Sequence, residues 1–147
     1  MSVHIRPATE ADVPAIFSLI QELAAYELAP EQVTNTPENL KADLFEKNLC
    51  EAIVAEKEHI VVGFALYYTS YSTWKGACLY LEDFYVMEEE RQNGIGQLLF
   101  DRVVETAQER KVQRMDWQVL TWNEPAIRFY EKQKAILDPE WLNGRLF

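Results

Sequence analysis

The stretch that decides the fold runs from Leu79 to Arg110 and opens with LYLEDFYV, an apolar run that contains Glu82 and Asp83. A polar connection follows, and Gly94-Ile95-Gly96 then begins a segment whose apolar residues recur at helical spacing. The pattern predicts a strand, a glycine loop and a helix. Because a helix start carries unpaired N–H groups and the positive end of the helix dipole, this loop favours a phosphate or pyrophosphate ligand.

Common nucleotide-binding motifs fit this loop poorly. A dinucleotide fingerprint needs a third glycine where this chain has Leu99, and the Gly-Lys-Ser/Thr of a Walker loop occurs nowhere in the sequence. Two glycines alone are more often turn and packing residues. The motif that remains is R-x-x-G-x-G, formed by Arg91–Gly96.

Several separated motifs carry a family resemblance: YSTWKG at 71–76, YLED at 80–83, RQNGIG at 91–96, and WNEP at 122–125 followed by Phe129 and Tyr130. In this order they resemble the GNAT superfamily of N-acetyltransferases, and most of all its diamine (spermidine/spermine) and thialysine branch. The resemblance spans nearly the whole chain. It implies acetyl-CoA as co-substrate, with the pyrophosphate at Arg91–Gly96.

The composition is that of an ordinary globular protein. The 147 residues, 48% of them hydrophobic, fit one acetyltransferase domain at 1–147. Since no apolar run approaches the ~18 residues of a membrane span, we expect a cytoplasmic protein that does not bind membranes. Twenty-four acidic and fourteen basic residues give a net charge of −10, which argues against nucleic acid and is compatible with a cationic substrate. Cys50 and Cys78 lack metal-ligand spacing, so we expect small buried side chains and no metal.

Periodicity and capping residues predict the secondary structure. Strands are expected at 3–6, 51–56, 60–68, 79–86, 115–120 and 141–147, and helices at 12–26, 37–47, 95–110 and 123–132. The order βααβββαβαβ predicts an α/β (α+β) fold with a mixed, mostly antiparallel sheet and helices on both faces. The resemblance implies that strands 79–86 and 115–120 are a central parallel pair that splays apart around the pantetheine arm.

Acetyl transfer to an amine needs a proton acceptor, because an alkylammonium of pKa near ~10.4 leaves roughly one molecule in 2,500 neutral at pH 7. Glu82 and Asp83 are the candidates, since consecutive carboxylates are unusual in an interior strand; the alternative is an exposed edge or a strand end. Neighbours in a strand point to opposite faces, so both serve one site only if a bulge breaks the alternation. With the resemblance, we expect Glu82 to take the proton and Asp83 to support it.

Tyr130 alone would be interpreted as a core aromatic, and the resemblance makes it the acid that protonates the departing thiolate. The resemblance assigns the amine substrate to Tyr26, Glu27, Glu82 and Asp83. It assigns acetyl-CoA to a longer set: Phe84, Tyr85, Val86, Arg91, Gln92, Asn93, Gly94, Ile95, Gly96, Gln97, Asn123, Ala126 and Tyr130.

The chain departs from the family pattern in three places. Lys134 stands where a glycine usually follows the Tyr130 helix, so it either adopts a left-handed conformation or ends the helix differently. Leu142 stands where the polyamine enzymes tend to carry a substrate-side glutamate. The sequence ends at Phe147, where relatives usually continue the last strand.

These observations predict an acetyl-CoA-dependent N-acetyltransferase that acts by direct attack in a ternary complex. The expected acceptor is a diamine, a polyamine or a thialysine-like amino acid. The expected assembly is a homodimer. Four crowded aromatic residues fit either its interface or the core: Tyr67, Tyr68, Tyr71 and Trp74. Two alternatives stay open, a non-catalytic acyl-CoA-binding module and a protein or peptide N-acetyltransferase.

Overall fold

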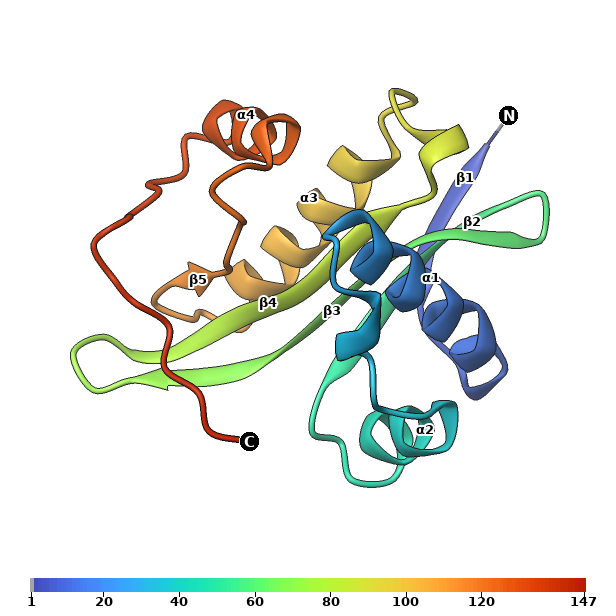
Figure 1. Cartoon of the computed structure of the whole chain (residues 1–147), viewed down its shortest axis with the longest axis horizontal. Helices are drawn as coiled ribbons and strands as arrows, with labels where there is room; N and C mark the ends of the chain where they lie inside the picture. Colours follow the sequence, from blue (N-terminus) through green and yellow to red (C-terminus); the bar gives the residue numbers. More distant parts are fainter. Residues whose placement is uncertain (1) are drawn as a thin grey trace. The chain divides into compact units, whose positions relative to one another are not determined.

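A computed structural model describes residues 2–147, which divide into two compact units after Trp117. In the first unit the described residues form a five-stranded sheet in the order β1-β2-β3-β4-β5 (Figure 1). Its strands are β1 (Val3–Pro7), β2 (Glu51–Lys57), β3 (Ile60–Ser72), β4 (Gly76–Val86) and β5 (Met115–Asp116). The first four pair antiparallel and β5 pairs parallel with β4, so the predicted mixed, mostly antiparallel sheet is confirmed.

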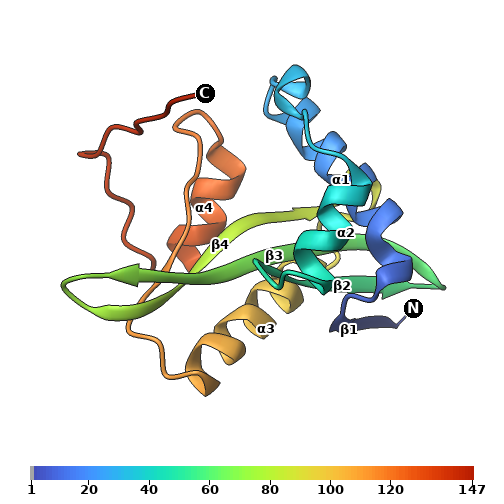
Figure 2. The same cartoon turned by 90° about the horizontal axis from the view of Figure 1, so that it is seen from below.

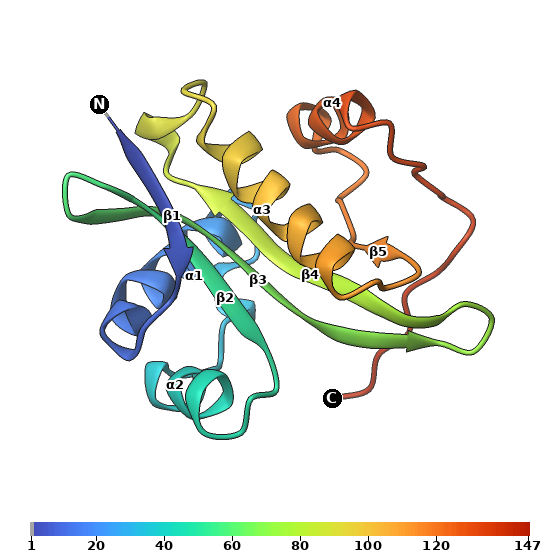
Figure 3. The ribbon, with the colours of Figure 1, turned by 180° about the vertical axis from the view of Figure 1, so that it is seen from behind.

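Helices cover both faces of this sheet, as predicted. Figure 2 shows α1 (Val13–Tyr26) and α2 (Pro37–Phe45) on one face and α3 (Ile95–Glu109) on the other. From behind, α3 runs along β3 and β4 (Figure 3). The start of α2 follows the expected chemistry, since the Thr36 hydroxyl accepts the Asn39 N–H at 3.1 Å and Pro37 occupies the first turn.

The core beneath α1 and α2 is built from apolar residues of both helices and of alternate positions on the strands. Its buried members are Val13, Ile16, Phe17, Leu19, Leu40, Leu44, Ala52, Val54, Phe64, Leu66 and Tyr85. On the opposite face, α3 comes close because β3 carries Gly63 there. A side chain at this position would lie 3.0 Å from the Tyr85 carbonyl oxygen and 3.1 Å from Leu99 Cδ1, so the glycine permits the approach.

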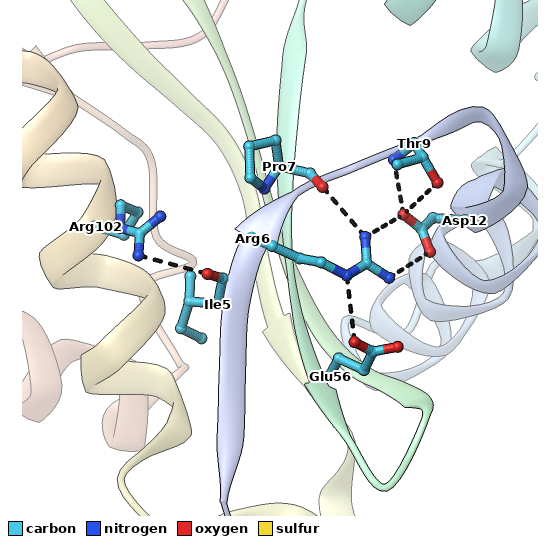
Figure 4. Close-up of polar contacts among 7 residues, drawn as sticks. All are labelled: Ile5, Arg6, Pro7, Thr9, Asp12, Glu56 and Arg102. Atoms are coloured by element: carbon cyan, nitrogen blue, oxygen red, sulfur yellow. Dashed lines mark hydrogen bonds and ion pairs between the residues drawn. The ribbon is translucent and has the colours of Figure 1, made fainter.

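A cluster of charged side chains fixes the connection between β1 and α1 (Figure 4). The Arg6 guanidinium donates to both carboxylate oxygens of Asp12, at 2.7 and 3.0 Å, and to Glu56 at 3.3 Å. Asp12 also accepts the Thr9 backbone N–H at 2.7 Å. Asp12 is buried, and this set of hydrogen bonds offsets the desolvation of its charge and lowers its pKa, with Arg6 as the largest cause.

The pairing of β3 with β4 contains one irregularity. Tyr67 lies opposite Leu81, whereas Leu66, the residue just before it on β3, lies opposite Asp83. Glu82 is therefore the extra residue of a β-bulge, the feature required for the two carboxylates to serve one site.

Two strand predictions are wrong. The strand expected at 115–120 ends at Asp116, because its only pairs with β4 are Leu79–Met115 and Tyr80–Asp116 and the bulge begins two residues beyond Tyr80. A bulge bends and twists its strand, which draws β4 away from a parallel neighbour. Residues 141–147 have a strand-like sequence but form no strand: all are exposed, and none is part of a β-ladder within the described chain. The parallel pair thus lies at the edge of the described sheet rather than at its centre.

The second unit, from Gln118 onward, is built around α4 (Glu124–Lys132). The Asn123 side chain caps this helix by accepting the Ala126 N–H at 3.4 Å. Past its end, Lys134 adopts a left-handed φ of 64°, and the Ala135 N–H bonds the Tyr130 carbonyl at 3.2 Å. The first of the two conformations expected for Lys134 is confirmed. Among residues 2–147, no helix has the length and apolar character needed to cross a bilayer.

Candidate active site

The bulge gathers carboxylates on the α1 face of the sheet. Residues directly opposite each other in a ladder point to the same face, so Asp83 points to the α1 side together with Leu66. Burial there, followed by the charges of Glu82 and then Glu27, raises the pKa of Asp83 to about 7. Glu82 is exposed. Burial raises the pKa of the Cys50 thiol, a half-buried group packed against the same core, and the charges of Asp43, Glu51 and then Glu82 add to that rise.

Glu27 reaches this site from the end of α1. The helix stops in a Schellman-type turn, with Leu28 at a left-handed φ of 63° and the Ala29 N–H bonded to the Ala24 carbonyl at 2.9 Å. Leucine is unfavourable in that conformation, and such local strain is common at functional sites. The turn presents Tyr26 and Glu27 at the helix end, and burial raises the pKa of Glu27.

Two tyrosines flank the carboxylates on the other side of the bulge. Tyr68 and Tyr80 lie opposite each other across β3 and β4, with ring centroids 5.4 Å apart. Burial, followed by the charge of Glu82, raises the pKa of both phenols, that of Tyr80 to about 12. The sequence analysis assigned neither tyrosine to the site. Tyr80 stands two residues before Glu82 in β4, and since residues i and i+2 of a strand share a face, this spacing is a signal that could have found Tyr80.

Beyond Tyr80, β4 has an open edge in the described chain. The Met87 N–H donates to Val62 of β3 at 2.8 Å, and backbone groups alternate between the two edges of a strand. Phe84 and Val86 therefore direct their N–H and C=O groups away from β3, and the Val86 C=O already accepts a hydrogen bond from Arg91 at 3.0 Å. This edge offers an amide-containing chain the hydrogen bonds that a neighbouring strand would make.

The glycine loop lies at the end of β4 and forms the start of α3. Gly94 caps the helix at a left-handed φ of 78°, and apart from Gly94 itself and its two chain neighbours no described residue has a heavy atom within 4 Å of where a Cβ would stand. Gly96 stands against the Phe84 ring, whose nearest atom would be 3.5 Å from a Cβ there. The cap residue has no side chain to accept the first-turn N–H groups, so these amides suit an anion.

Arg91 occupies a position that the sequence did not predict. Its Nε donates to the Val86 carbonyl at 3.0 Å, and its guanidinium carbon lies 5.2 Å from the centre of the Tyr26 ring and 5.1 Å from that of Tyr85. The Tyr85 hydroxyl in turn donates to Glu22 of α1 at 3.3 Å.

The other loop residues expected to meet acetyl-CoA lie on either side of this turn. Gln92 has a left-handed φ of 68°, Asn93 is exposed, and Ile95 is buried. Gln97 in the first turn of α3 donates to Asp101 at 2.8 Å.

Tyr130 and Asn123 belong to the second unit. The Tyr130 side chain is buried and its ring makes an edge-to-face contact with Phe129, with centroids 5.5 Å apart. Asn123 is buried at the start of α4, where it holds the N–H of Ala126. Within residues 2–147, no group of three or more His, Cys, Asp or Glu side chains is arranged to hold a metal ion.

Comparison with known proteins gives a family match over most of the chain. The description of the matching family is acetyltransferase (GNAT) family, and the match covers residues 16–134. The chain is 42% identical over 138 residues to the thialysine N-epsilon-acetyltransferase of Bos taurus, with 88% of this chain and 81% of that protein covered. It is 36% identical over 141 residues to spermidine/spermine N(1)-acetyltransferase-like protein 1 of Homo sapiens, which covers 90% of this chain and 20% of that protein.

Solved structures give the same fold. A possible acetyltransferase from Clostridium difficile 630 superposes with a TM-score of 0.81 at 22% identity, covering all of this chain and 99% of the other. At that identity the likeness concerns the fold alone.

Proposed function

Since the chain belongs to the GNAT family of acetyltransferases, we propose that it transfers the acetyl group of acetyl-CoA to a primary amine of a small cationic molecule. The observation that carries the proposal is the group of carboxylates at the β4 bulge, where Asp83 has a pKa of about 7 beside Glu82 and Glu27. An amine that attacks a thioester must first lose a proton, and it arrives as a cation.

GNAT acetyltransferases use acetyl-CoA as co-substrate, and the residues present here fit that molecule. The first-turn amides of α3 and the open space over Gly94 suit the pyrophosphate, with Arg91–Gln97 around it. The outward backbone groups of Phe84 and Val86, on either side of Tyr85, suit the amides of the pantetheine arm. We assign Asn123, Ala126 and Tyr130 to the co-substrate on family resemblance.

In the proposed reaction the amine attacks the thioester directly, in a ternary complex of enzyme, amine and acetyl-CoA. Glu82, which is open to water, takes the ammonium proton through a water molecule. Asp83 and Glu27 hold the positive charge of the substrate. Tyr130 returns a proton to the sulfur as the thiolate leaves.

The carboxylates also favour an acceptor with two positive charges. Burial, followed by the charges of Glu82 and Glu27, raises the pKa of Asp83, so an ionised Asp83 is unfavourable there without a cation. One ammonium is consumed by the reaction, and a second a few carbons away remains to pair with a carboxylate. Diamines, polyamines and thialysine-like amino acids meet this requirement.

The test compares kcat/KM for diaminobutane and butylamine in the parent protein, in Glu82→Gln and in Glu89→Gln, an exposed carboxylate of the 3-10 turn at Glu88–Glu90. One charge-assisted hydrogen bond of ~1.5–3 kcal/mol predicts a diamine preference of roughly 10- to 150-fold. Glu82→Gln should lower kcat/KM and move the basic limb of its pH profile upward, while Glu89→Gln matches the parent.

Other outcomes identify the alternatives. If butylamine serves as well as the diamine, the acceptor is not a polycation. If a peptide with a free amino group is the only acceptor, the chain is a peptide N-acetyltransferase. Binding of acetyl-CoA with no transfer to any amine would mark a non-catalytic module.

The homodimer is a further proposal, supported by apolar side chains at the tip of the β3–β4 hairpin. Tyr71 and Trp74 are 76% and 88% exposed. Tyr67 was expected in this interface but is buried in the core of the sheet, and Tyr68 is half-buried. Sedimentation of Tyr71→Ser/Trp74→Ser tests the assignment, since a dimer held by this tip should dissociate.

A further inference from the structure

Arg91 is held from three directions. Its Nε donates to the Val86 carbonyl at 3.0 Å, and the aromatic rings of Tyr26 and Tyr85 lie 5.2 and 5.1 Å from its guanidinium carbon. Tyr26 is the last residue of α1, whereas Tyr85 and Val86 end β4. The side chain therefore connects the end of a helix to the end of a strand.

A second contact joins the same two elements. The Tyr85 hydroxyl donates to Glu22, one turn before Tyr26 on α1, at 3.3 Å. Burial raises the pKa of Tyr85 and the Arg91 charge offsets part of that rise. The Tyr85 ring is thus placed between a cation and a helix carboxylate, and α1 is tied to β4 along its last turn.

The end of α1 is where the carboxylate site begins. Glu27 follows Tyr26 directly, and its charge is felt at Asp83. The turn after it depends on Leu28 in a left-handed conformation, an arrangement that needs support from its surroundings. The contact of Arg91 with Tyr26 is such a support.

We propose that Arg91 is a positioning residue of the amine site, which holds Tyr26 and through it Glu27 opposite Asp83. This inference rests on the proposed function, since it concerns the site assigned to the amine. It differs from a role in phosphate binding, which requires only the positive charge. Contacting two rings while donating a hydrogen bond from Nε uses the extended guanidinium, and a lysine, which has a single compact ammonium, cannot make all three contacts.

Arg91→Lys separates the two roles because it keeps the charge and removes the planar group. With a diamine as acceptor, we expect KM for the amine to rise roughly 3- to 30-fold, the range of one or two cation–π contacts. KM for acetyl-CoA should rise less than KM for the amine, because the positive charge beside the phosphates remains, and kcat should stay within about twofold of the parent because the proposed acid and base remain. Tyr26→Leu should raise the amine KM in the same way, and Arg91→Lys/Tyr26→Leu should add nothing further.

Arg110→Lys is the matched control. Arg110 also lies over an aromatic ring, that of Tyr67 at 5.8 Å, and also bonds a second group, the Glu51 carboxylate. It lies at the end of α3 rather than at the end of α1, so both KM values should match the parent. Circular dichroism melting checks that each variant is folded.

The result that overturns the inference is a rise in KM for acetyl-CoA alone, which would make Arg91 a phosphate contact only. An additive double variant would also overturn it. Failure of the proposed function is distinguishable, because the parent protein itself would then show no diamine acetylation. If the parent acetylates diamines and Arg91→Lys has the same KM for the amine, the positioning role is refuted and the proposed function stands.

Discussion

Asp83 of β4 lies opposite Leu66 of β3, one position out of step with the Tyr67–Leu81 pair beside it. In an unbroken ladder Glu82 would occupy that position, and Asp83 would point to the α3 face. The single extra residue therefore sends Asp83 into the apolar surroundings of Leu66, on the face where α1 ends. Its raised pKa follows from that placement.

The first prediction concerns stability against pH. Asp83 has a pKa of about 7 in the folded protein against an ordinary 3.8, so between these values the folded state holds a proton that the unfolded chain has released. The free energy of unfolding should therefore decrease as pH rises through this window. Asp83→Asn removes the effect. Its free energy of unfolding should exceed that of the parent by roughly 1–3 kcal/mol at pH 8 and by nearly nothing at pH 4. Urea unfolding at both pH values measures this, with Glu89→Gln as control. Equal stabilities at pH 8 would mean that Asp83 ionises normally.

The second prediction concerns the charged cluster at the start of α1. Asp12→Asn removes the closer of the two anions that pair with the Arg6 guanidinium, leaving Glu56 at 3.3 Å, and should cost roughly 2–4 kcal/mol of unfolding free energy at pH 7. Because the pKa of Asp12 is lowered in the folded state, its contribution is full above about pH 4 and is lost as pH falls through the folded pKa. Glu10→Gln, which breaks only an exposed pair with Lys41, is the control and should stay within about 0.5 kcal/mol. Equal free energies of unfolding for the parent and Asp12→Asn at pH 7 would show that the cluster does not stabilise the fold.

The third prediction concerns the glycine loop. Gly94→Val places a branched side chain at a φ of 78° and over the amides that suit the pyrophosphate. Calorimetry should show acetyl-CoA binding weakened by roughly 10- to 100-fold or more, as one or two charge-assisted hydrogen bonds are lost. Gly94→Asn, which tolerates the left-handed backbone, should lose less. Gly144→Val, in open space in the second unit, should bind normally. Unchanged affinity in Gly94→Val would show that the loop does not bind acetyl-CoA.

The fourth prediction concerns Tyr130. Tyr130→Phe keeps the ring that contacts Phe129 and removes only the hydroxyl, so it distinguishes an acid from a core residue. We expect kcat to fall by ~10²–10⁴ with the melting temperature nearly unchanged. A variant as fast as the parent would return Tyr130 to a structural role.

The fifth prediction concerns the end of α4. Lys134 adopts the left-handed conformation that glycine adopts without strain, so Lys134→Gly should stabilise the helix end by ~0.5–1 kcal/mol. Lys132→Gly, two residues earlier at the last residue of α4, should instead destabilise it by up to ~1 kcal/mol. Hydrogen exchange of the α4 amides reports both changes. Faster exchange in Lys134→Gly would contradict the expected relief of strain.

Sequence patterns predicted the elements whose signals are local. The cap at Thr36, the turn between β2 and β3, and the glycine start of α3 each depend on a few consecutive residues, and each is present as expected. The need for a bulge between Glu82 and Asp83 also followed from strand alternation. That the bulge exists depends on the partner strand, because register is a property of two strands and not of one.

The wrong strand predictions and the unpredicted contacts of Arg91 both involve partners that are distant in sequence. Residues 117–120 and 141–147 carry strand-like composition, yet a strand forms only where a neighbour supplies hydrogen bonds. The place of Arg91 in the loop before Gly94 predicts a phosphate contact, which stays a prediction. Its contacts with Tyr26 and Tyr85 join residues 65 and 6 positions away in sequence, and nothing local indicates the first of them.

The sheet of the first unit adds its strands in the order in which the chain is synthesised. Each strand from β2 onward can pair with a neighbour that has already left the ribosome, and the β2–β3–β4 meander closes through short turns. The short turns make the pairings within this meander local, and local contacts favour rapid folding. The exception is β5, which must wait for α3 and can contribute only two pairs. Only the part of the β4 edge at Leu79 and Tyr80 is therefore covered by a strand, and it is covered last, so a nascent chain exposes this aggregation-prone edge until β5 has formed.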